Sequence, residues 1–110
     1  MTLLEKQEER ALKHFKEILA QQFSSEVVSI RLFGSKARGD SHAASDIDVL
    51  VVTKQDNWRL KEEIGKVATA ILLDYGIYLS IKVMGQFLQQ RLIDAGSPFI
   101  RNIQREGIAL

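Results

Sequence analysis

Two aspartates, two positions apart, are the residues whose type and spacing most clearly point to chemistry. Asp46 and Asp48 run directly into the apolar stretch VLVV (49–52), which is typical of an interior strand. Because side chains alternate along a strand, both carboxylates face the same way, about 6.6 Å apart along the backbone. Without a cation their repulsion would raise a pKa or destabilise the strand. Oxygen ligands of this kind favour Mg²⁺ or Mn²⁺, which also take phosphate oxygens as ligands.

A Gly-Ser pair at the end of an earlier apolar segment suggests a place for phosphate. The missing side chain of Gly34 lets backbone amides approach an anion, and the Ser35 hydroxyl can donate to phosphate oxygens. Lys36 and Arg38 add positive charge nearby. Taken singly, each feature has an ordinary alternative: a turn for Gly-Ser, solvated loop charges for Lys36 and Arg38, and a solvated turn for the aspartate pair.

Hydrophobic periodicity predicts the elements that hold these residues. Strands are predicted at 27–33, 46–53 and 77–84, helices at 3–22, 57–73, 86–95 and 98–106, and a loop at 35–45 that begins with a helical turn. Asp56 or Asn57 is expected to cap the second long helix, and Ser97 beside Pro98 is expected to cap the last one.

Composition limits what the chain can be. Its 110 residues suit one domain, taken as 1–110, and a net charge of +1 argues against strong duplex DNA binding. No run approaches the length of a membrane span, and the charged N-terminus does not read as a secretory signal, so a cytoplasmic location is expected. With no Cys and two His residues, any metal would be held by oxygen.

The stretch GSKARGDSHAASDID (34–48) has the form G-S-x-A-R-G, five residues, S-D-x-D. It resembles the DNA polymerase β-like nucleotidyltransferase superfamily, specifically its minimal nucleotidyltransferases, and SPFIRNIQREGIAL (97–110) looks like the C-terminal segment of small members. The resemblance implies an α+β, polymerase β palm-like fold. The expected sheet is small and mixed, with about three strands and helices packed on one face.

The resemblance also implies an activity: transfer of a nucleoside monophosphate, AMP from ATP or another NTP, with release of pyrophosphate. By that analogy Gly34 and Ser35 would hold the β and γ phosphates, with Arg38 near phosphate. Asp46 and Asp48 would be the catalytic residues that bind Mg²⁺ or Mn²⁺. Ser45 would cap or orient the turn at Asp46.

The third predicted strand, IYLSIKVM (77–84), departs from the family pattern because active members carry a third carboxylate there and this strand has no acid. Alternation places Tyr78, Ser80 and Lys82 on the polar face, so the missing acid corresponds best to Ser80, with Leu79 left open. Lys82 would either partly neutralise the aspartates or lie solvated at the rim.

Two functions therefore stay open. One is an Mg²⁺-dependent nucleotidyltransferase whose acceptor is a HEPN-domain protein, in a toxin-antitoxin pair where the transferase is the antitoxin. The other is a catalytically degenerate module of the same fold that binds nucleotide or toxin. The pairing is implied by the resemblance, and homo- or hetero-oligomers fit either function.

Overall fold

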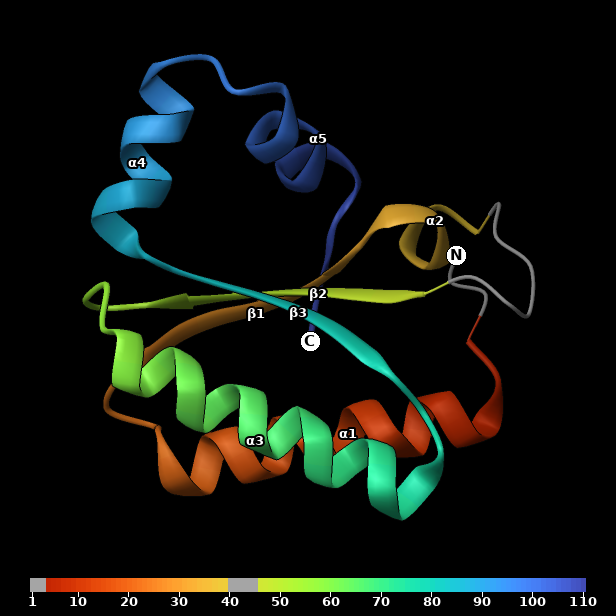
Figure 1. The fold of residues 1–110 in the computed structure, drawn as a ribbon. Coiled ribbons are helices and arrows are strands. Elements are labelled where there is room, and N and C mark those ends of the chain that lie inside the picture. The colour runs from red at the N-terminus through yellow and green to blue at the C-terminus, as the bar shows by residue number, and fades with distance from the viewer. Residues whose placement is uncertain (1–3, 40–45) are drawn as a thin grey trace.

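The computed structural model describes residues 4–39 and 46–110 and shows helices on either side of a central sheet (Figure 1). The predicted contribution of Ser45 lies outside the described residues. Along the chain the elements are α1 (Lys6–Gln22), β1 (Val27–Phe33), α2 (Gly34–Arg38), β2 (Ile47–Thr53), α3 (Trp58–Tyr75), β3 (Leu79–Gly85), α4 (Gln86–Asp94), α5 (Pro98–Glu106) and β4 (Ile108–Ala109).

Within the described chain, the strands form one mixed sheet in the order β3-β2-β1-β4. β1 runs antiparallel to β2 and to β4, while β2 and β3 are parallel. The α+β class and the mixed sheet are confirmed. The sheet has four strands in the described ranges, one more than expected. That strand, β4, pairs only Ile108 with Leu32 and Ala109 with Arg31, so it is too short to show a period-2 pattern.

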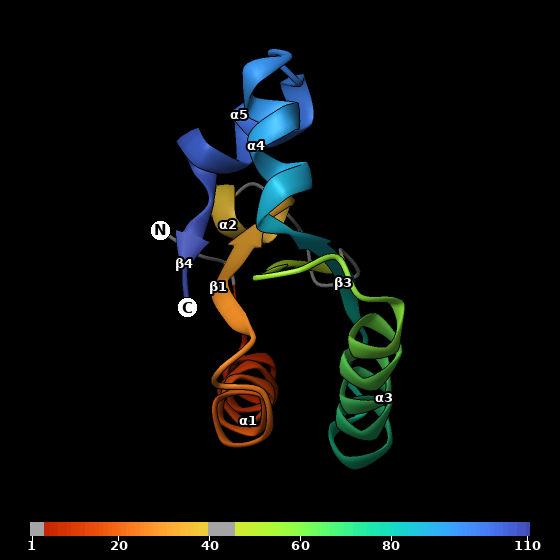
Figure 2. The ribbon, with the colours of Figure 1, turned by 90° about the vertical axis from the view of Figure 1, so that its left-hand side faces the viewer.

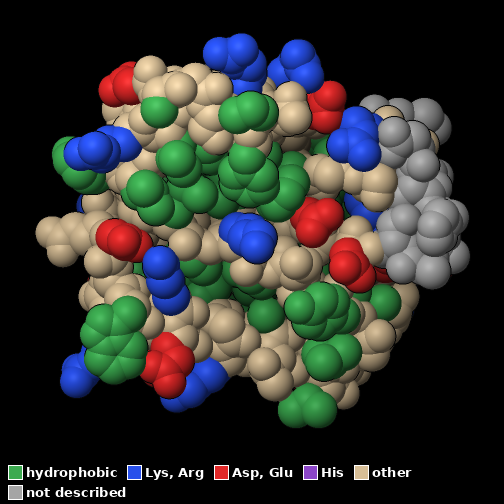
Figure 3. All heavy atoms as spheres, turned by 45° about the horizontal axis from the view of Figure 1, so that its top comes forward, with side chains coloured by type: hydrophobic (Ala, Val, Ile, Leu, Met, Phe, Trp, Pro, Cys, Tyr) green, Lys and Arg blue, Asp and Glu red, His purple; other side chains and the backbone are tan. Residues whose placement is uncertain are grey.

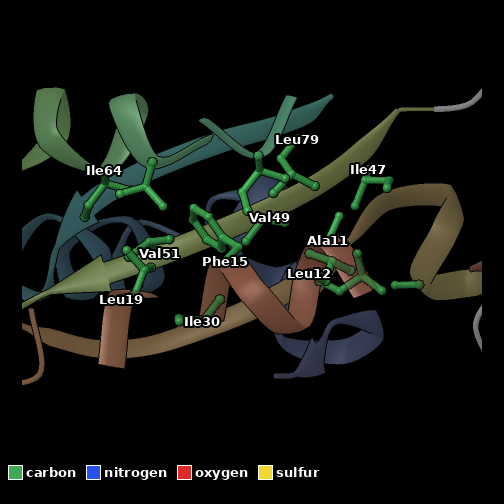
Figure 4. Close-up of a cluster of buried hydrophobic side chains, with 14 of the residues drawn as sticks. Ala11, Leu12, Phe15, Leu19, Ile30, Ile47, Val49, Val51, Ile64 and Leu79 are labelled. Carbon is green, nitrogen blue, oxygen red and sulfur yellow. The ribbon is translucent and has the colours of Figure 1, made fainter. Parts of the chain in front are cut away.

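Both faces of the sheet are covered, so the expectation that helices pack on one face is wrong. α1 and α3 lie on one side, and α4 and α5 lie on the other (Figures 1 and 2). Val49 and Val51 pack with buried side chains of α1 and α3 (Figure 4). Leu50 and Val52 point the other way and pack with Ile100 and other side chains of α4 and α5. A strand buried on both faces is what a continuous apolar run specifies.

Helix ends follow the predicted signals with one exception. The Asn57 side chain accepts hydrogen bonds from the amides of Arg59 (2.9 Å) and Leu60 (3.4 Å), so Asn57 rather than Asp56 caps α3. Ser97 is the N-cap residue of α5 and Pro98 its first residue, as predicted, but the Ser97 side chain makes no capping hydrogen bond. None of the helices in the described ranges is long and apolar enough to cross a membrane.

Candidate active site

Gly34 and Asp48 approach each other closely where β1 ends and β2 begins. Phe33 is the strand partner of Asp48, so the following residue, Gly34, lies beside the Asp48 side chain. Gly34 has φ 75°, and a Cβ built there would lie 2.5 Å from Oδ2 of Asp48. The backbone angle favours glycine at this position, and any side chain there would require the Asp48 carboxylate to move. The absent side chain keeps the carboxylate and the backbone of the Gly-Ser turn next to each other.

Asp46 and Asp48 are the acidic pair of the site. Asp46 is exposed immediately before β2, and Asp48 is half-buried within it, on the sheet face that carries α4 and α5. Burial raises the pKa of the Asp48 carboxyl above its ordinary value, and the negative charge of Asp46 raises it further. Lys82, a hydrogen bond from the Ser80 hydroxyl, and Arg38 act in the opposite direction. Lys82, Ser80 and Arg38 therefore do not fully offset the effects of burial and of the Asp46 charge on Asp48.

β3 brings Ser80 and Lys82 to the same face. The parallel register pairs Ser80 with Asp48 and Lys82 with Leu50. Ser80 therefore stands directly beside Asp48, while Leu79 is buried on the opposite face. Among the described residues, no group of three or more His, Cys, Asp or Glu side chains is placed to hold a metal ion. Within the described chain, the site is thus a pair of carboxylates, a hydroxyl and an ammonium.

The sequence predicts that Lys36 adds positive charge on the phosphate side of the site. The structure contradicts this prediction. The Lys36 side chain is buried, with 1% of the residue exposed, and its Nζ lies 3.2 Å from Oε2 of Glu8. Glu8 also accepts the backbone amide of Glu5 (2.9 Å). The solvated alternative for Lys36 is wrong as well. The side chain turns away from solvent and ties α2 to α1.

Glu8 is the residue that sequence reasoning missed, although a signal was present. It falls four residues after Leu4 and four before Leu12, which places a charged side chain within the apolar stripe of the first helix. A charge in that position requires a buried partner. The periodicity shows that Glu8 is out of place on an apolar stripe. Only the fold shows that its partner is Lys36, 28 residues further along the chain.

Ser35 and Arg38 lie in α2, directly after Gly34. Ser35 is half-buried, and its carbonyl accepts the amide of Gly39, which closes the helical turn. Arg38 is exposed, and its Nη1 lies 3.4 Å from Oε2 of Glu106 in α5. Its charge also lowers the pKa of Asp48, so it acts at the same site as the two aspartates.

Comparison with known proteins agrees with this arrangement. Residues 12–108 match the model of the nucleotidyltransferase domain family. A candidate protein adenylyltransferase of Methanocaldococcus jannaschii is 35% identical over 103 residues, covering 94% of this chain and 97% of that protein. A second protein of the same organism, also named a candidate protein adenylyltransferase, is 32% identical over 84 residues, covering 76% of this chain and 85% of its own.

Solved structures share the fold. The structure of a candidate minimal nucleotidyltransferase aligns with a TM-score of 0.60 at 24% identity, covering 93% of this chain and 94% of that one. A crystal structure of a candidate nucleotidyltransferase from Sulfolobus solfataricus aligns with a TM-score of 0.52 at 22% identity, covering 91% and 76%. With the motif, the mixed sheet and the match over 12–108 in agreement, the chain belongs to the nucleotidyltransferase domain family.

Proposed function

We propose that this protein transfers AMP from ATP to a hydroxyl group of a protein acceptor, and that it needs Mg²⁺ or Mn²⁺ to do so. The observation that carries the proposal is the close approach of Asp48 to Gly34, with Asp46 on the same side. This arrangement sets a carboxylate pair next to the Gly-Ser turn. The two relatives named as candidate protein adenylyltransferases support ATP as donor and a protein as acceptor.

The residues fit a divalent cation. Asp46 and Asp48 supply hard oxygen ligands. Burial and then the negative charge of Asp46 raise the pKa of Asp48, and Lys82 and Arg38 only partly offset them. A cation held by these carboxylates would stabilise negative charge on the α-phosphate and on the departing pyrophosphate. The donor set in the described chain is a small one, which suits a metal that keeps waters and phosphate oxygens as its other ligands.

The chain's own residues would bind and orient the nucleotide. Gly34 and Ser35 would hold the β and γ phosphates, with Arg38 near phosphate. Ser80 stands beside Asp48 and lowers the pKa of its carboxyl, so it would help to orient that carboxylate. In the transfer, the acceptor oxygen forms a bond to the α-phosphorus and the bond from that phosphorus to the bridging oxygen breaks. Pyrophosphate leaves with the electron pair, and the acceptor proton passes to solvent.

The acceptor we propose is a HEPN-domain partner, with this protein acting as the antitoxin of the pair. The support is the resemblance of the motif and of the C-terminal segment to minimal nucleotidyltransferases. Complex formation with such a partner would supply the acceptor-binding surface.

The test incubates the protein with its partner, Mg²⁺ and ATP labelled at the α-phosphate. Wild type should label the partner, and Asp48→Asn should not. Asp74→Asn is the matched control, because Asp74 is an exposed acid near the end of α3 and should leave labelling unchanged. Equal labelling by wild type and Asp48→Asn would refute the proposal.

A binding module without turnover is the second candidate, and the acid-free β3 favours it. Ser80 stands beside Asp48 where a further carboxylate would complete the metal ligands. In that case the protein would neutralise its partner by contact alone. Antitoxicity and complex formation would then survive the Asp46→Asn/Asp48→Asn double change, and their loss in a folded double variant would exclude this candidate.

A further inference from the structure

A cavity of about 150 Å³ opens beside Gly34, between α2 and α5. Phe33, Phe99 and Ile103 form its apolar wall. Phe33 and Phe99 meet edge to face, with ring centroids 5.6 Å apart and planes at 88°. Phe33 is also the strand partner of Asp48. The cavity therefore adjoins the carboxylate pair and has an aromatic wall.

The polar part of the cavity comes from the two helices. Asn102 lies one helical turn after Phe99 on α5, and both line the cavity. Arg38 and Glu106 also line it, and their ion pair spans from α2 to α5. The neutral polar group on this wall is the Asn102 carboxamide. Its Oδ1 accepts one hydrogen bond from Nη2 of Arg105 (2.9 Å), which leaves the second lone pair of that oxygen and the NH₂ group to bind a ligand.

These walls suit a small, flat, aromatic ligand with a hydrogen-bonding edge. Phe99 is 39% exposed, so part of its ring is open to stacking. Nucleobases stack on such rings, and an Asn carboxamide matches the donor and acceptor pattern on one edge of adenine. Hydrophobic side chains also gather on the side of the molecule that carries α4 and α5, with charged side chains around them (Figure 3).

We propose that this cavity binds the base of the nucleotide, with Phe99 stacking on it and Asn102 selecting adenine. The inference rests on the proposed function, because it presumes that a nucleotide binds at the carboxylate pair. Gly34 links the two parts of the site: it lines the cavity and also lies against Asp48. A nucleotide with its phosphates at Gly34 and Ser35 can therefore reach the cavity with its base.

Calorimetric titration measures the contribution of the base to binding separately from that of the phosphates. Wild type, Phe99→Ala and Asn102→Ala are each titrated with ATP, GTP and tripolyphosphate in the presence of Mg²⁺. Phe99→Ala should weaken ATP binding about 5- to 150-fold while tripolyphosphate binding stays the same. Asn102→Ala should reduce the preference for ATP over GTP toward one. Phe87→Ala is the matched control, because Phe87 is 74% exposed on α4 and does not line the cavity.

Each outcome decides between the two proposals. If Phe99→Ala weakens ATP and tripolyphosphate equally, or leaves ATP binding unchanged, the base does not bind in this cavity. Asn102 is exposed, so its variant tests the cavity without disturbing the core, and an unchanged ATP preference would overturn the selection of adenine. If wild type binds tripolyphosphate as tightly as ATP, the base subsite is refuted while the proposed function still stands. A wild type that binds neither ligand refutes the proposed function itself.

Discussion

Replacing Gly34 by alanine should both destabilise the fold and displace the carboxylate on which the site depends. The new Cβ would meet Oδ2 of Asp48 at 2.5 Å, whereas ordinary contacts begin at 3.4 Å. The backbone angle, φ 75°, also belongs to the left-handed region that L side chains rarely adopt. Gly34→Ala therefore carries two separate costs.

Gly76 allows the two costs to be measured apart. It has φ 69° at the end of α3, and a Cβ built there meets nothing within 4 Å. Gly76→Ala should therefore lose only the backbone term, about 1–2 kcal/mol. Gly34→Ala should lose that amount plus the overlap with Asp48, about 1–3 kcal/mol more, as is usual where atoms are forced into occupied space. The total is about 2–5 kcal/mol, and the size of the second term depends on how far Asp48 can rotate.

Urea unfolding of the metal-free proteins measures these free energies, and a double change isolates the contact. Asp48→Ala removes the atom that the new Cβ would strike, so in that background Gly34→Ala should cost no more than Gly76→Ala does in wild type. If the two alanine variants are equally destabilised, and removal of the Asp48 side chain gives no relief, the close approach is not the reason for glycine at position 34.

Three further predictions concern stability. Glu8→Gln should destabilise the protein by about 3 kcal/mol, because the Lys36 ammonium stays buried after losing a carboxylate 3.2 Å away; the exposed Glu9→Gln is the control, and equal unfolding midpoints would contradict the buried pair. Asp48→Asn should stabilise the metal-free protein at pH 7. Because the folded pKa of Asp48 lies above its ordinary 3.8, the stability linked to the protonated carboxyl is present below that value and lost as pH rises through the folded pKa. The gain should therefore shrink on acidification toward pH 3, and a gain that is constant across a pH series of thermal melts would refute the cause. Gly65→Ala, in the middle of α3 with nothing within 4 Å of a new Cβ, should raise the free energy of unfolding by about 0.5–1 kcal/mol in the same urea titration, and a loss would show that the site is not open.

Much of the fold could be predicted from local patterns. Alternation in IYLSIKVM places Ser80 and Leu79 on opposite faces, and the structure has Ser80 beside Asp48 and Leu79 in the core. The run of apolar residues at 49–52 predicts an interior strand, and the same pattern is typical of a strand that is covered on both faces.

Features that depend on distant contacts could not be predicted in this way. The partner of Lys36 comes from 28 residues away, and periodicity marks Glu8 as unusual without naming what it pairs with. The two-residue β4 has no pattern of its own and exists because β1 offers an edge. The cavity at Phe99 and Asn102 depends on how α5 packs against α2, which neither segment specifies alone.

The buried pair between Glu8 and Lys36 has a practical consequence for where the domain can be cut. The family match begins at residue 12, inside α1, and so excludes Glu8. A fragment trimmed to that boundary would keep the whole Gly-Ser and aspartate motif but would lose the carboxylate beneath it. The boundary of the family match is thus not a boundary of the fold, and a fragment made for biochemical work should retain all of α1.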